Sequence, residues 1–492
     1  MLDVTGYSPR LVWEIFQELS AVPRPSGHEE KMVEYLLQFG RTHGIATELN
    51  GAGNVLMRAP ASSGYEHLVP VVLQGHIDMV CEKVADSAHD FMKDPIVLEA
   101  TDGWVHAQGT TLGADDGIGV AAALAVLVDP AVAHGPLECL FTVDEEVTMS
   151  GAEGVAADAL RGRILLNLDS EDEGQLFIGC AGGVDTSATL EYEAEEVGEA
   201  MRWWRIGVSG LRGGHSGDDI DKPRANAIKL LARLLYELND STKEGVRLAA
   251  FQGGNLLNTI PREAEAVVAC RADKAGETRN HLLGLIAAMK SEVTRYEPGL
   301  SIALDEVAPE AEVFGVDSGL KLVYLLNALP HGVYAMSQEV PGLVETSTNL
   351  ARVRTMPGHR VLIETSQRSA TEWGKATIAE MVGATFALAT CNHTQSNDYP
   401  GWAPNSQSPI LGIVREAYVG LFGREPEVRA IHAGLECGFF AKKIPGVDMV
   451  SFGPTIVGAH TPQERLEVES VQKFWDLLLR VLKSLPSDNG AQ

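Results

Sequence analysis

Several features that mark particular classes of protein are scarce in this sequence. Its 492 residues include only six cysteines, at positions 81, 139, 180, 270, 391 and 437, with no CxxC pair among them. Such scattered cysteines do not form a disulfide scaffold, and we expect the thiols to be reduced. The apolar run at 117–128 is too short to cross a bilayer, and the first residues lack a basic segment followed by an apolar one. We therefore expect a cytoplasmic protein without a membrane partner.

Basic side chains are scarce too. Lysine and arginine total 39 against 67 aspartate and glutamate residues, which gives a formal net charge of −28. A charge of that sign repels nucleic acid and anionic lipid, so we expect no nucleic-acid partner. Hydrophobic residues make up 45% of the chain, which is ample for a buried core.

Hydrophobic patterning divides the chain into an α/β part and an insert. A chain of this length exceeds what one hydrophobic core usually supports, so more than one domain is expected. Short apolar runs that alternate with helical patterns near both ends predict a central mixed sheet covered by helices. The middle of the chain has two successive strand-helix-strand-strand-helix blocks, which predict an inserted α+β domain. The expected boundaries are 1–183 and 399–492 for the α/β domain and 184–398 for the insert.

Two local patterns make specific predictions within this plan. Ser26 followed by Glu29 is typical of a capping box at the start of a helix that runs toward Gly44. Residues 392–408 are rich in Asn, Ser and Pro, which predicts a loop. Strands are expected at 54–59, 69–75, 137–143, 164–169 and 446–453, and helices near 9–19, 117–128, 223–239, 277–296, 318–328, 370–389 and 464–484.

Acidic and histidine side chains stand at the ends of the apolar runs. His76 and Asp78 follow the 69–75 run two residues apart, so they share one face of a strand. On their own they fit a core histidine that a neighbouring carboxylate satisfies, just as Asp115 and Asp116 fit a helix cap. Four acid-tipped ends in one stretch of chain favour a bound cation instead, because converging carboxylates repel one another. Imidazole nitrogen with carboxylate oxygen suits zinc, with manganese or cobalt as substitutes. The residues at these ends are His76, Asp78, Asp115, Asp116, Asp144, Glu145, Glu146 and Asp169.

Five motifs occur in a fixed order along the chain: HID at 76–78, GADDGIG at 113–119, DEE at 144–146, NLDSE at 167–171 and GAHTPQE at 458–464. Together they resemble the motifs of the M20 family of dinuclear metallopeptidases. Within that family, the chain is most similar to the branch that cleaves aminoacyl-histidine dipeptides, and the similarity extends over nearly the whole chain. The resemblance implies that the α/β domain is a zinc-peptidase catalytic domain and that the insert is a lid and dimerisation domain.

The resemblance also implies a role for each motif residue. It implies that two zinc ions per subunit are held by His76, Asp115, Glu146, Asp169 and His460. Asp115 would bridge the ions, Glu145 would act as the general base toward a metal-bound hydroxide, and Asp78 would orient the His76 ring. Neighbouring residues of a regular strand point to opposite faces, so Glu145 and Glu146 are expected on an irregular turn.

Four residues are candidates for substrate binding, namely His215, Asn258, Arg368 and Glu436. His215 lies in the glycine-rich GGHSG, and the resemblance implies that it polarises the scissile carbonyl from the same or the partner subunit of a homodimer. Arg368 fits a bidentate clamp for a substrate carboxylate, and Glu436 fits a partner for a substrate ammonium. Without the resemblance, an incidental histidine, a surface arginine and a solvated or capping glutamate remain open. His432, Glu345 and Asn349 are pocket candidates with less support.

The favoured function is a dinuclear zinc dipeptidase that hydrolyses Xaa-His and other dipeptides. A second hydrolase function fits the same family, namely an amidase or deacylase that acts on N-acyl amino acids. A non-catalytic binding protein is disfavoured, because every expected ligand and the base are present in the sequence.

Overall fold

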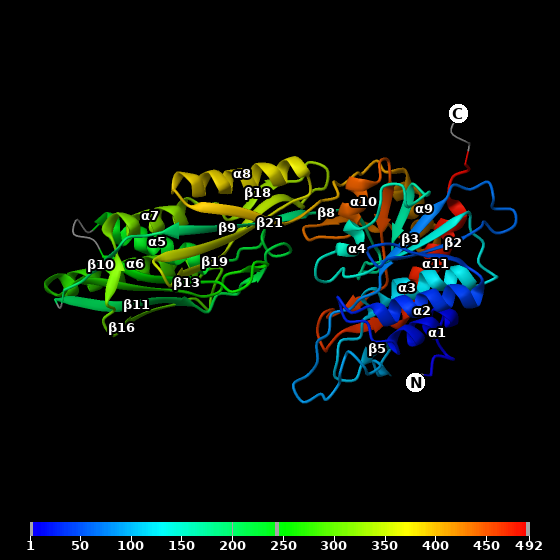
Figure 1. The fold of residues 1–492 in the computed structure, drawn as a ribbon, viewed down its shortest axis with the longest axis horizontal. Helices are drawn as coiled ribbons and strands as arrows, with labels where there is room; N and C mark the ends of the chain where they lie inside the picture. Colours follow the sequence, from blue (N-terminus) through cyan, green and yellow to red (C-terminus); the bar gives the residue numbers. More distant parts are fainter. Residues whose placement is uncertain (1–2, 199, 242–245, 489–492) are drawn as a thin grey trace. The chain divides into compact units, whose positions relative to one another are not determined.

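The protein forms two compact units, which Figure 1 shows coloured along the sequence. The computed structural model describes residues 3–198, 200–241 and 246–488. Unit 1 comprises Met1–Cys180, Trp402–Ala430 and Leu435–Gln492, and unit 2 comprises Ala181–Gly401 and Ile431–Gly434. Both units combine helices with a sheet, so the expected α/β fold class is confirmed. Unit 2 also includes a short segment beyond the expected insert, because the N–H of Ala181 donates to the carbonyl oxygens of Ile431 and Ala433.

Unit 1 is built on a mixed sheet. Among the described residues this sheet has eight strands, in the order β1-β2-β6-β3-β7-β23-β8-β22, and its centre is parallel. Every residue of β3 and of β6 is buried, which explains why these strands read as continuous apolar runs. A smaller sheet has the order β24-β25-β5-β4. The strands of unit 1 are β1 (Ala46–Leu49), β2 (Val55–Ala59), β3 (Val71–His76), β4 (Leu98–Thr101), β5 (Trp104–Ala107), β6 (Leu137–Thr142), β7 (Ile164–Asn167), β8 (Gln175–Cys180), β22 (Glu427–Ile431), β23 (Asp448–Ser451), β24 (Ile456–Val457) and β25 (Arg465–Glu467).

The helices of unit 1 differ in how far they are enclosed. α1 buries one face, which includes Trp13 and Phe16, whereas the alanine-rich α3 is buried over most of its length and packs against α1 and β3. The regular part of α3 begins only after Asp115 and Asp116, whose backbone dihedrals are not helical. The helices of unit 1 are α1 (Arg10–Ser20), α2 (Glu30–His43), α3 (Ala114–Val128), α4 (Ser150–Glu153), α9 (Pro409–Phe422), α10 (Cys437–Lys443) and α11 (Val468–Ser484).

The capping box predicted at Ser26 and Glu29 is wrong. α2 begins at Glu30, and no side chain caps its first turn. The Ser26 hydroxyl instead donates to Asp78 Oδ2 at 2.7 Å, and Glu29 Oε1 accepts the N–H of Gly27 at 2.6 Å. A tertiary hydrogen bond to a buried carboxylate has therefore replaced the local one.

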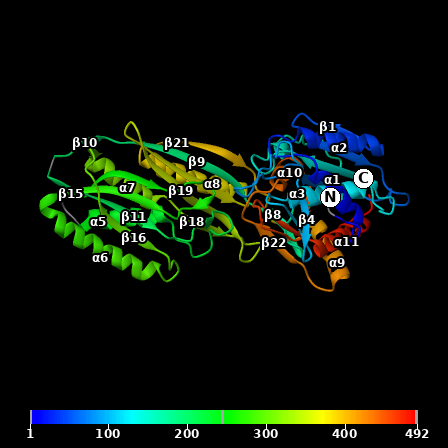
Figure 2. The same cartoon turned by 90° about the horizontal axis from the view of Figure 1, so that it is seen from below.

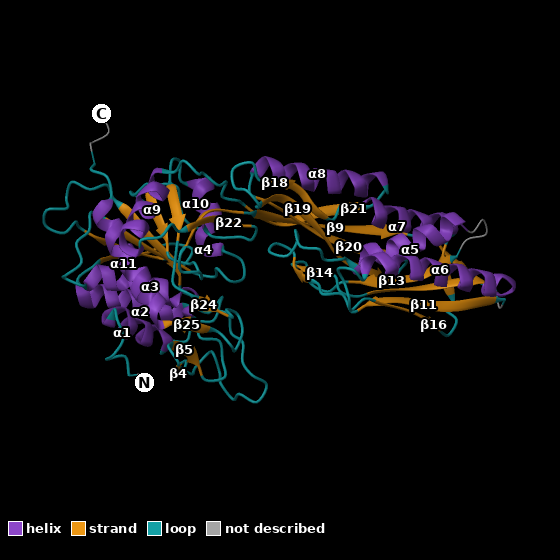
Figure 3. Cartoon of the chain, turned by 180° about the vertical axis from the view of Figure 1, so that it is seen from behind, coloured by secondary structure: helices purple, strands orange, loops and turns teal. Residues whose placement is uncertain are grey.

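Unit 2 is a two-layer α+β structure. Its main sheet has nine strands among the described residues, in the order β16-β11-β15-β13-β19-β20-β9-β21 with β18 beside β19. Figure 3 shows α5, α6, α7 and α8 on one face of this sheet, and apolar side chains such as Trp204, Leu235 and Phe251 form the core between the layers. The elements of unit 2 are β9 (Gly182–Glu191), β10 (Ala194–Glu196), β11 (Met201–Ser209), β12 (Gly214–His215), α5 (Ala227–Ser241), β13 (Arg247–Gly253), β14 (Thr259–Ile260), β15 (Ala264–Arg271), α6 (Ala275–Val293), β16 (Ser301–Glu306), β17 (Glu312–Phe314), α7 (Val316–Ala328), β18 (Gly332–Met336), β19 (Val344–Met356), β20 (Arg360–Ser369), α8 (Glu372–Leu388) and β21 (Asn392–Tyr399).

The loop predicted at 392–408 is wrong over its first half. Asn392–Tyr399 forms β21, which pairs antiparallel with β9 at the edge of the sheet, as Figure 2 shows. Every residue of β21 except Tyr399 is exposed. An edge strand that is solvated on both faces has no apolar alternation, so hydrophobic periodicity does not reveal it.

Candidate metal centre

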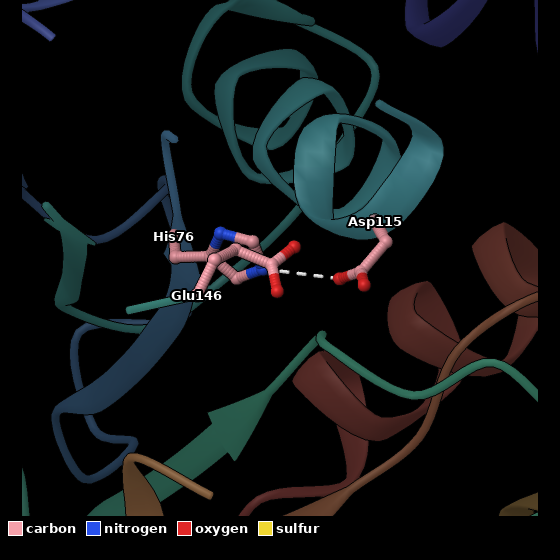
Figure 4. A group of neighbouring side chains, drawn as sticks. All are labelled: His76, Asp115 and Glu146. Atoms are coloured by element: carbon pink, nitrogen blue, oxygen red, sulfur yellow. Dashed lines mark hydrogen bonds and ion pairs between the residues drawn. The ribbon is translucent and has the colours of Figure 1, made fainter. Parts of the chain in front are cut away.

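The expected metal ligands of unit 1 come from neighbouring strand ends. Because β3, β6 and β7 are adjacent and β3 runs parallel to both others, their carboxyl ends meet at one edge of the sheet. His76 is the last residue of β3, and Asp169 lies two residues beyond the end of β7. Glu146 lies in the turn after β6, and Asp115 lies at the start of α3. Figure 4 shows the side chains of His76, Asp115 and Glu146 converging.

Asp115 faces a different histidine with each of its carboxylate oxygens. Asp115 Oδ1 lies 3.0 Å from His76 Nε2, and Asp115 Oδ2 lies 3.1 Å from His460 Nε2. Each histidine nitrogen also faces a second carboxylate. His76 Nε2 lies 3.5 Å from Asp169 Oδ1, and His460 Nε2 lies 3.0 Å from Glu146 Oε2. The five side chains thus form two groups of one nitrogen and two oxygens, and the groups share Asp115.

These nitrogen–oxygen spacings are compatible with bound metal, and one ligand atom each from His76, Asp115 and Glu146 lie within 4.8 Å of one another. Two ligand atoms about 2.1 Å from a tetrahedral ion lie about 3.4 Å apart. The four distances between ligand atoms are 3.0, 3.1, 3.5 and 3.0 Å, close to that value. Glu146 Oε1 is buried without a hydrogen-bond partner among the described residues, so it offers a further ligand atom. Two imidazoles and three carboxylates are a donor set that suits divalent ions such as zinc.

The carboxylates of this cluster lie so close together that positive charge is needed to neutralise them. Hydrogen bonds with Asp115 and Glu146 raise the pKa of His460 to about 11. Burial acts to lower the pKa of His76, but the carboxylates of Asp169 and Asp115 raise it well above its usual value. Burial also raises the pKa of Asp169 well above its usual value. Packed carboxylates behave in this way when only protons neutralise them, and a divalent cation would displace those protons on binding.

Asp78 organises both the His76 ring and the turn that carries Glu145 and Glu146. Its Oδ1 lies 3.3 Å from His76 Nδ1 and accepts the N–H of Glu145 at 3.0 Å. Its Oδ2 accepts the N–H of Glu146 at 3.2 Å and the Ser26 hydroxyl at 2.7 Å. Burial opposes the charge, yet His76 and these hydrogen bonds lower the pKa of Asp78 to about 2. A carboxylate near Nδ1 favours a ring proton on that nitrogen, which leaves Nε2 free for a metal.

The turn after β6 is irregular, as expected if the adjacent side chains of Glu145 and Glu146 have different roles. Asp144 has a φ of 56°, in the left-handed region, and its carboxylate accepts hydrogen bonds from the hydroxyls of Thr148 and Ser150. Burial raises the pKa of Glu145 well above its usual value. A carboxylate with a raised pKa is suited to accept and return a proton.

Glu436, the candidate partner for a substrate ammonium, lies in the interior of unit 1. Its side chain is completely buried, and its Oε2 accepts hydrogen bonds from Gln74 Nε2 at 2.6 Å and from Thr142 Oγ1 at 2.7 Å. Gln74 Oε1 in turn accepts from Asn167 Nδ2 at 2.6 Å. Burial raises the pKa of Glu436 to about 7. The carboxylate therefore belongs to a buried polar network that links β3, β6 and β7, and its Oε1 has no hydrogen-bond partner among the described residues.

Three other charged residues complete the centre. Arg24 and Glu464 are each 2% exposed and bind the backbone around the start of α3, and the motifs gave neither of them a role. A charged side chain in a loop carries no sequence signal of its burial, because its partners are distant backbone groups. Asp116 is buried at the start of α3, and burial raises the pKa of its carboxyl well above its usual value.

In unit 2, His215 presents a hydrogen-bond donor. The N–H groups of Gly217 and Asp218 donate to His215 Nδ1 at 3.3 and 3.2 Å, so the neutral ring carries its proton on Nε2. Burial and the charge of Arg368 lower the pKa of His215, which favours the neutral ring. A neutral imidazole with Nε2–H is the donor that polarising a carbonyl oxygen requires.

Arg368 is a buried cation that has no anionic partner within the described part of the chain. It is 8% exposed, its Nη1 donates to the Tyr399 hydroxyl at 3.1 Å, and its Nε has no partner among the described residues. Nearby, His432 Nε2 lies 2.7 Å from Ser347 Oγ, and burial together with the Arg368 charge lowers the pKa of His432 to about 3. A buried guanidinium without a counter-ion is unfavourable, so an anionic ligand group would stabilise this position.

The backbone on either side of Asn258 is held beside His215. Asn258 itself is exposed, and its carbonyl oxygen accepts the N–H of Ser216 at 2.8 Å. Asn349 Nδ2 donates to the carbonyl oxygens of Leu257 at 3.1 Å and Thr259 at 2.8 Å. The predicted substrate-binding residues of unit 2, His215, Asn258 and Arg368, therefore lie in one region of that unit.

Paired histidine and carboxylate groups at parallel strand ends, with a further carboxylate on the adjoining turn, are typical of metal-dependent hydrolases. Residues 72–484 match the sequence profile of Peptidase family M20/M25/M40, and the chain belongs to this family. It is therefore an enzyme of a class that hydrolyses peptide bonds.

Individual relatives share the full length of the chain. A protein from Escherichia coli (strain K12) named cytosol non-specific dipeptidase is 42% identical over 487 residues, which cover 99% of this chain and 100% of that one. The crystal structure of aminoacylhistidine dipeptidase from Vibrio alginolyticus is 40% identical, with a TM-score of 0.91 over 99% of each chain. A tripeptidase from Staphylococcus aureus shares the fold at a TM-score of 0.56 and 16% identity, over 97% of this chain and 98% of that one. Within the described residues, no helix has the length and apolar character needed to span a membrane.

Proposed function

We propose that this chain is a dinuclear zinc dipeptidase that hydrolyses Xaa-His and other dipeptides. The observation that carries the proposal is that the two oxygens of Asp115 lie 3.0 and 3.1 Å from His76 Nε2 and His460 Nε2. The full-length identity to proteins named as dipeptidases supports the substrate class. Two divalent ions held here would polarise the scissile carbonyl and lower the pKa of a water molecule to about 7.

The proposed ligands follow the two groups of side chains. His76 and Asp169 would hold one ion, His460 and Glu146 would hold the other, and Asp115 would contribute to both sites. Manganese or cobalt would be accepted by the same nitrogen and oxygen donors.

The proposed proton carrier is Glu145. It takes a proton from the attacking water and passes it to the leaving amine, which is the task of a general base that later acts as an acid. Asp78 is a positioning residue in this scheme. Its hydrogen bonds to the N–H groups of Glu145 and Glu146 fix the turn, and its contact with His76 fixes the ring.

The proposed substrate contacts lie on unit 2. Arg368 binds the C-terminal carboxylate of the dipeptide, which supplies the anion that this buried guanidinium lacks. His215 donates from Nε2 to the carbonyl oxygen as charge develops on it. Asn258 is a further polar contact. We also propose that unit 2 is a lid and dimerisation domain, that the protein is a homodimer, and that it acts in the cytosol, as the name of its Escherichia coli relative suggests.

The test is a substrate panel measured with and without metal. Hydrolysis of an Xaa-His dipeptide, a tripeptide and an N-acyl amino acid is followed in the purified protein, after chelation, and after zinc is restored. We expect rapid hydrolysis of the dipeptide, loss on chelation and recovery with zinc. Hydrolysis that resists chelation, or none on any peptide with two ions bound, would exclude a metallodipeptidase.

One observation favours a second candidate, an amidase or deacylase that acts on N-acyl amino acids. Such an enzyme needs no carboxylate to receive a free substrate amine, and Glu436 is completely buried. The same panel separates the two functions, because the second predicts faster hydrolysis of the N-acyl amino acid than of the dipeptide.

A further inference from the structure

Glu464 binds the backbone where it enters α3. Its Oε2 accepts the N–H of Leu112 at 2.7 Å and that of Gly113 at 2.9 Å. Its Oε1 accepts the N–H of Ala114 at 2.7 Å and lies 3.4 Å from the N–H of Asp115. Hydrogen bonds from backbone N–H groups to a buried carboxylate are among the stronger ones in proteins. A single side chain therefore fixes the turn that ends at the shared ligand of the metal centre.

Arg24 binds the same turn through its carbonyl groups. Its Nη2 donates to the carbonyl oxygen of Gly113 at 2.5 Å, while its Nη1 donates to those of Ile77 at 3.1 Å and Asp78 at 2.8 Å. The residues Ile77 and Asp78 directly follow His76, the last residue of β3. One planar guanidinium thus joins the strand end that carries His76 to the turn that carries Asp115.

Gly113 is the residue that both charged side chains bind. Its N–H donates to Glu464 and its carbonyl oxygen accepts from Arg24. Its φ of 69° lies in the left-handed region, which glycine adopts without steric penalty. A Cβ at this position would lie 2.6 Å from Arg24 Nη2 and 2.9 Å from Met79 Sδ. The turn is therefore held from both sides at a position that only glycine fits.

We propose that Arg24 and Glu464 are positioning residues of the metal centre. Acting through Gly113, they set the separation of His76 from Asp115, so that both side chains can reach one ion. Neither residue supplies a ligand atom in this scheme. The inference rests on the proposed metal centre, and it adds two residues whose loss should weaken metal binding. Changes to residues behind the ligands typically weaken metal affinity by about 10- to 100-fold.

The first test is Glu464→Gln. A carboxylate presents two acceptor oxygens, whereas an amide presents one oxygen and an NH2 group. In either orientation of the amide, backbone N–H groups on one side of the turn lose their acceptor. We expect zinc affinity, measured by competition with a chromophoric chelator, to fall by about 10- to 100-fold. We also expect the visible absorption bands of the cobalt-substituted protein to shift, because the ligand geometry changes.

The matched control is Glu171→Gln. The Glu171 carboxylate also acts electrostatically on Asp115, and it forms no side-chain hydrogen bond among the described residues. Burial raises the pKa of Glu171 to about 8 and also raises the pKa of Glu464, so Glu171→Gln makes the same chemical change at a second partly buried carboxyl without releasing the turn. The cobalt spectrum of Glu171→Gln should stay that of the unmodified protein. If Glu464→Gln matches Glu171→Gln in both zinc affinity and cobalt spectrum, the positioning role of Glu464 is wrong.

Arg24→Lys provides the second variant. Lysine keeps the positive charge but lacks the planar guanidinium that binds three carbonyl groups, so Arg24→Lys should also shift the cobalt spectrum. If Glu464→Gln does not fold, Arg24→Lys takes its place in the test. An Arg24→Lys protein with the zinc affinity and cobalt spectrum of Glu171→Gln would then refute the positioning role. In the double variant, the loss of zinc affinity should be smaller than the product of the two single losses, because both residues act on Gly113. Independent, multiplicative losses would contradict a shared turn. The proposed function is tested separately, since an unmodified protein that binds two zinc ions but hydrolyses no dipeptide would reject only the enzymatic proposal.

Discussion

Replacing Asp78 by asparagine should destabilise the metal-free protein by about 2–3 kcal/mol. The carboxylate accepts the N–H groups of Glu145 and Glu146 on different oxygens, at 3.0 and 3.2 Å. Asparagine has one side-chain oxygen, so one of these N–H groups would face an NH2 group. A buried N–H without an acceptor costs about 1–3 kcal/mol.

The lowered pKa of Asp78 leads to a similar figure. The pKa is about 2 in the folded protein against an ordinary value of 3.8. That difference corresponds to roughly 2.5 kcal/mol of folding stability. Because folding lowers this pKa, the stability is present above the ordinary value of 3.8 and is lost as the pH falls toward 2.

The assay is thermal unfolding of the metal-free protein across a pH series. At pH 7, Asp78→Asn should lower Tm by about 2–3 °C, and the deficit should narrow below about pH 4. The matched control is Asp158→Asn, because Asp158 is exposed. If both variants unfold at the same temperature at pH 7, or if the Asp78→Asn deficit does not change with pH, the charged carboxylate does not organise this turn.

Three further substitutions follow from the structure. Gly113→Ala should lower the free energy of unfolding by about 1–3 kcal/mol, because an alanine at a φ of 69° is strained and its Cβ would clash with the Arg24 guanidinium. An unchanged Tm in thermal unfolding would contradict this strain. Tyr399→Phe should raise KM for dipeptides more than it lowers kcat, because it removes the hydroxyl that accepts a hydrogen bond from Arg368 Nη1. A loss confined to kcat would argue against substrate binding by Arg368. Glu436→Gln should leave KM for Xaa-His unchanged in steady-state kinetics, because its side chain is completely buried, whereas a large rise in KM would restore the ammonium role.

The convergence of the proposed ligands His76, Asp115 and Asp169 could be predicted from the sequence, because these residues lie beside regular strands and a regular helix. His76 and Asp169 follow fully apolar runs, and parallel neighbouring strands necessarily bring their carboxyl ends to one edge. Asp115 precedes an alanine-rich helix whose start is equally visible in the sequence. The irregular turn at Glu145 and Glu146 followed from the need for two adjacent side chains to aim differently.

The remaining features depend on contacts that no local pattern records. Ser26 has the sequence of a helix cap but bonds to Asp78, a residue far along the chain. Glu464 and Arg24 are buried with backbone N–H and carbonyl groups as their partners. Every residue type has such groups, so the sequence does not indicate which ones these side chains bind. Glu436 sits in a small-residue turn that gives no sign of complete burial. The edge strand Asn392–Tyr399 is polar on both faces and so resembles a loop.

Zinc titration of the metal-free protein decides whether the two histidine and carboxylate groups form a dinuclear centre. Hydrolysis of an Xaa-His dipeptide should appear as zinc is added and should reach its maximum at two ions per chain, as the two oxygens of Asp115 facing His76 and His460 require. Full activity at one ion per chain, or activity without metal, would contradict the dinuclear assignment.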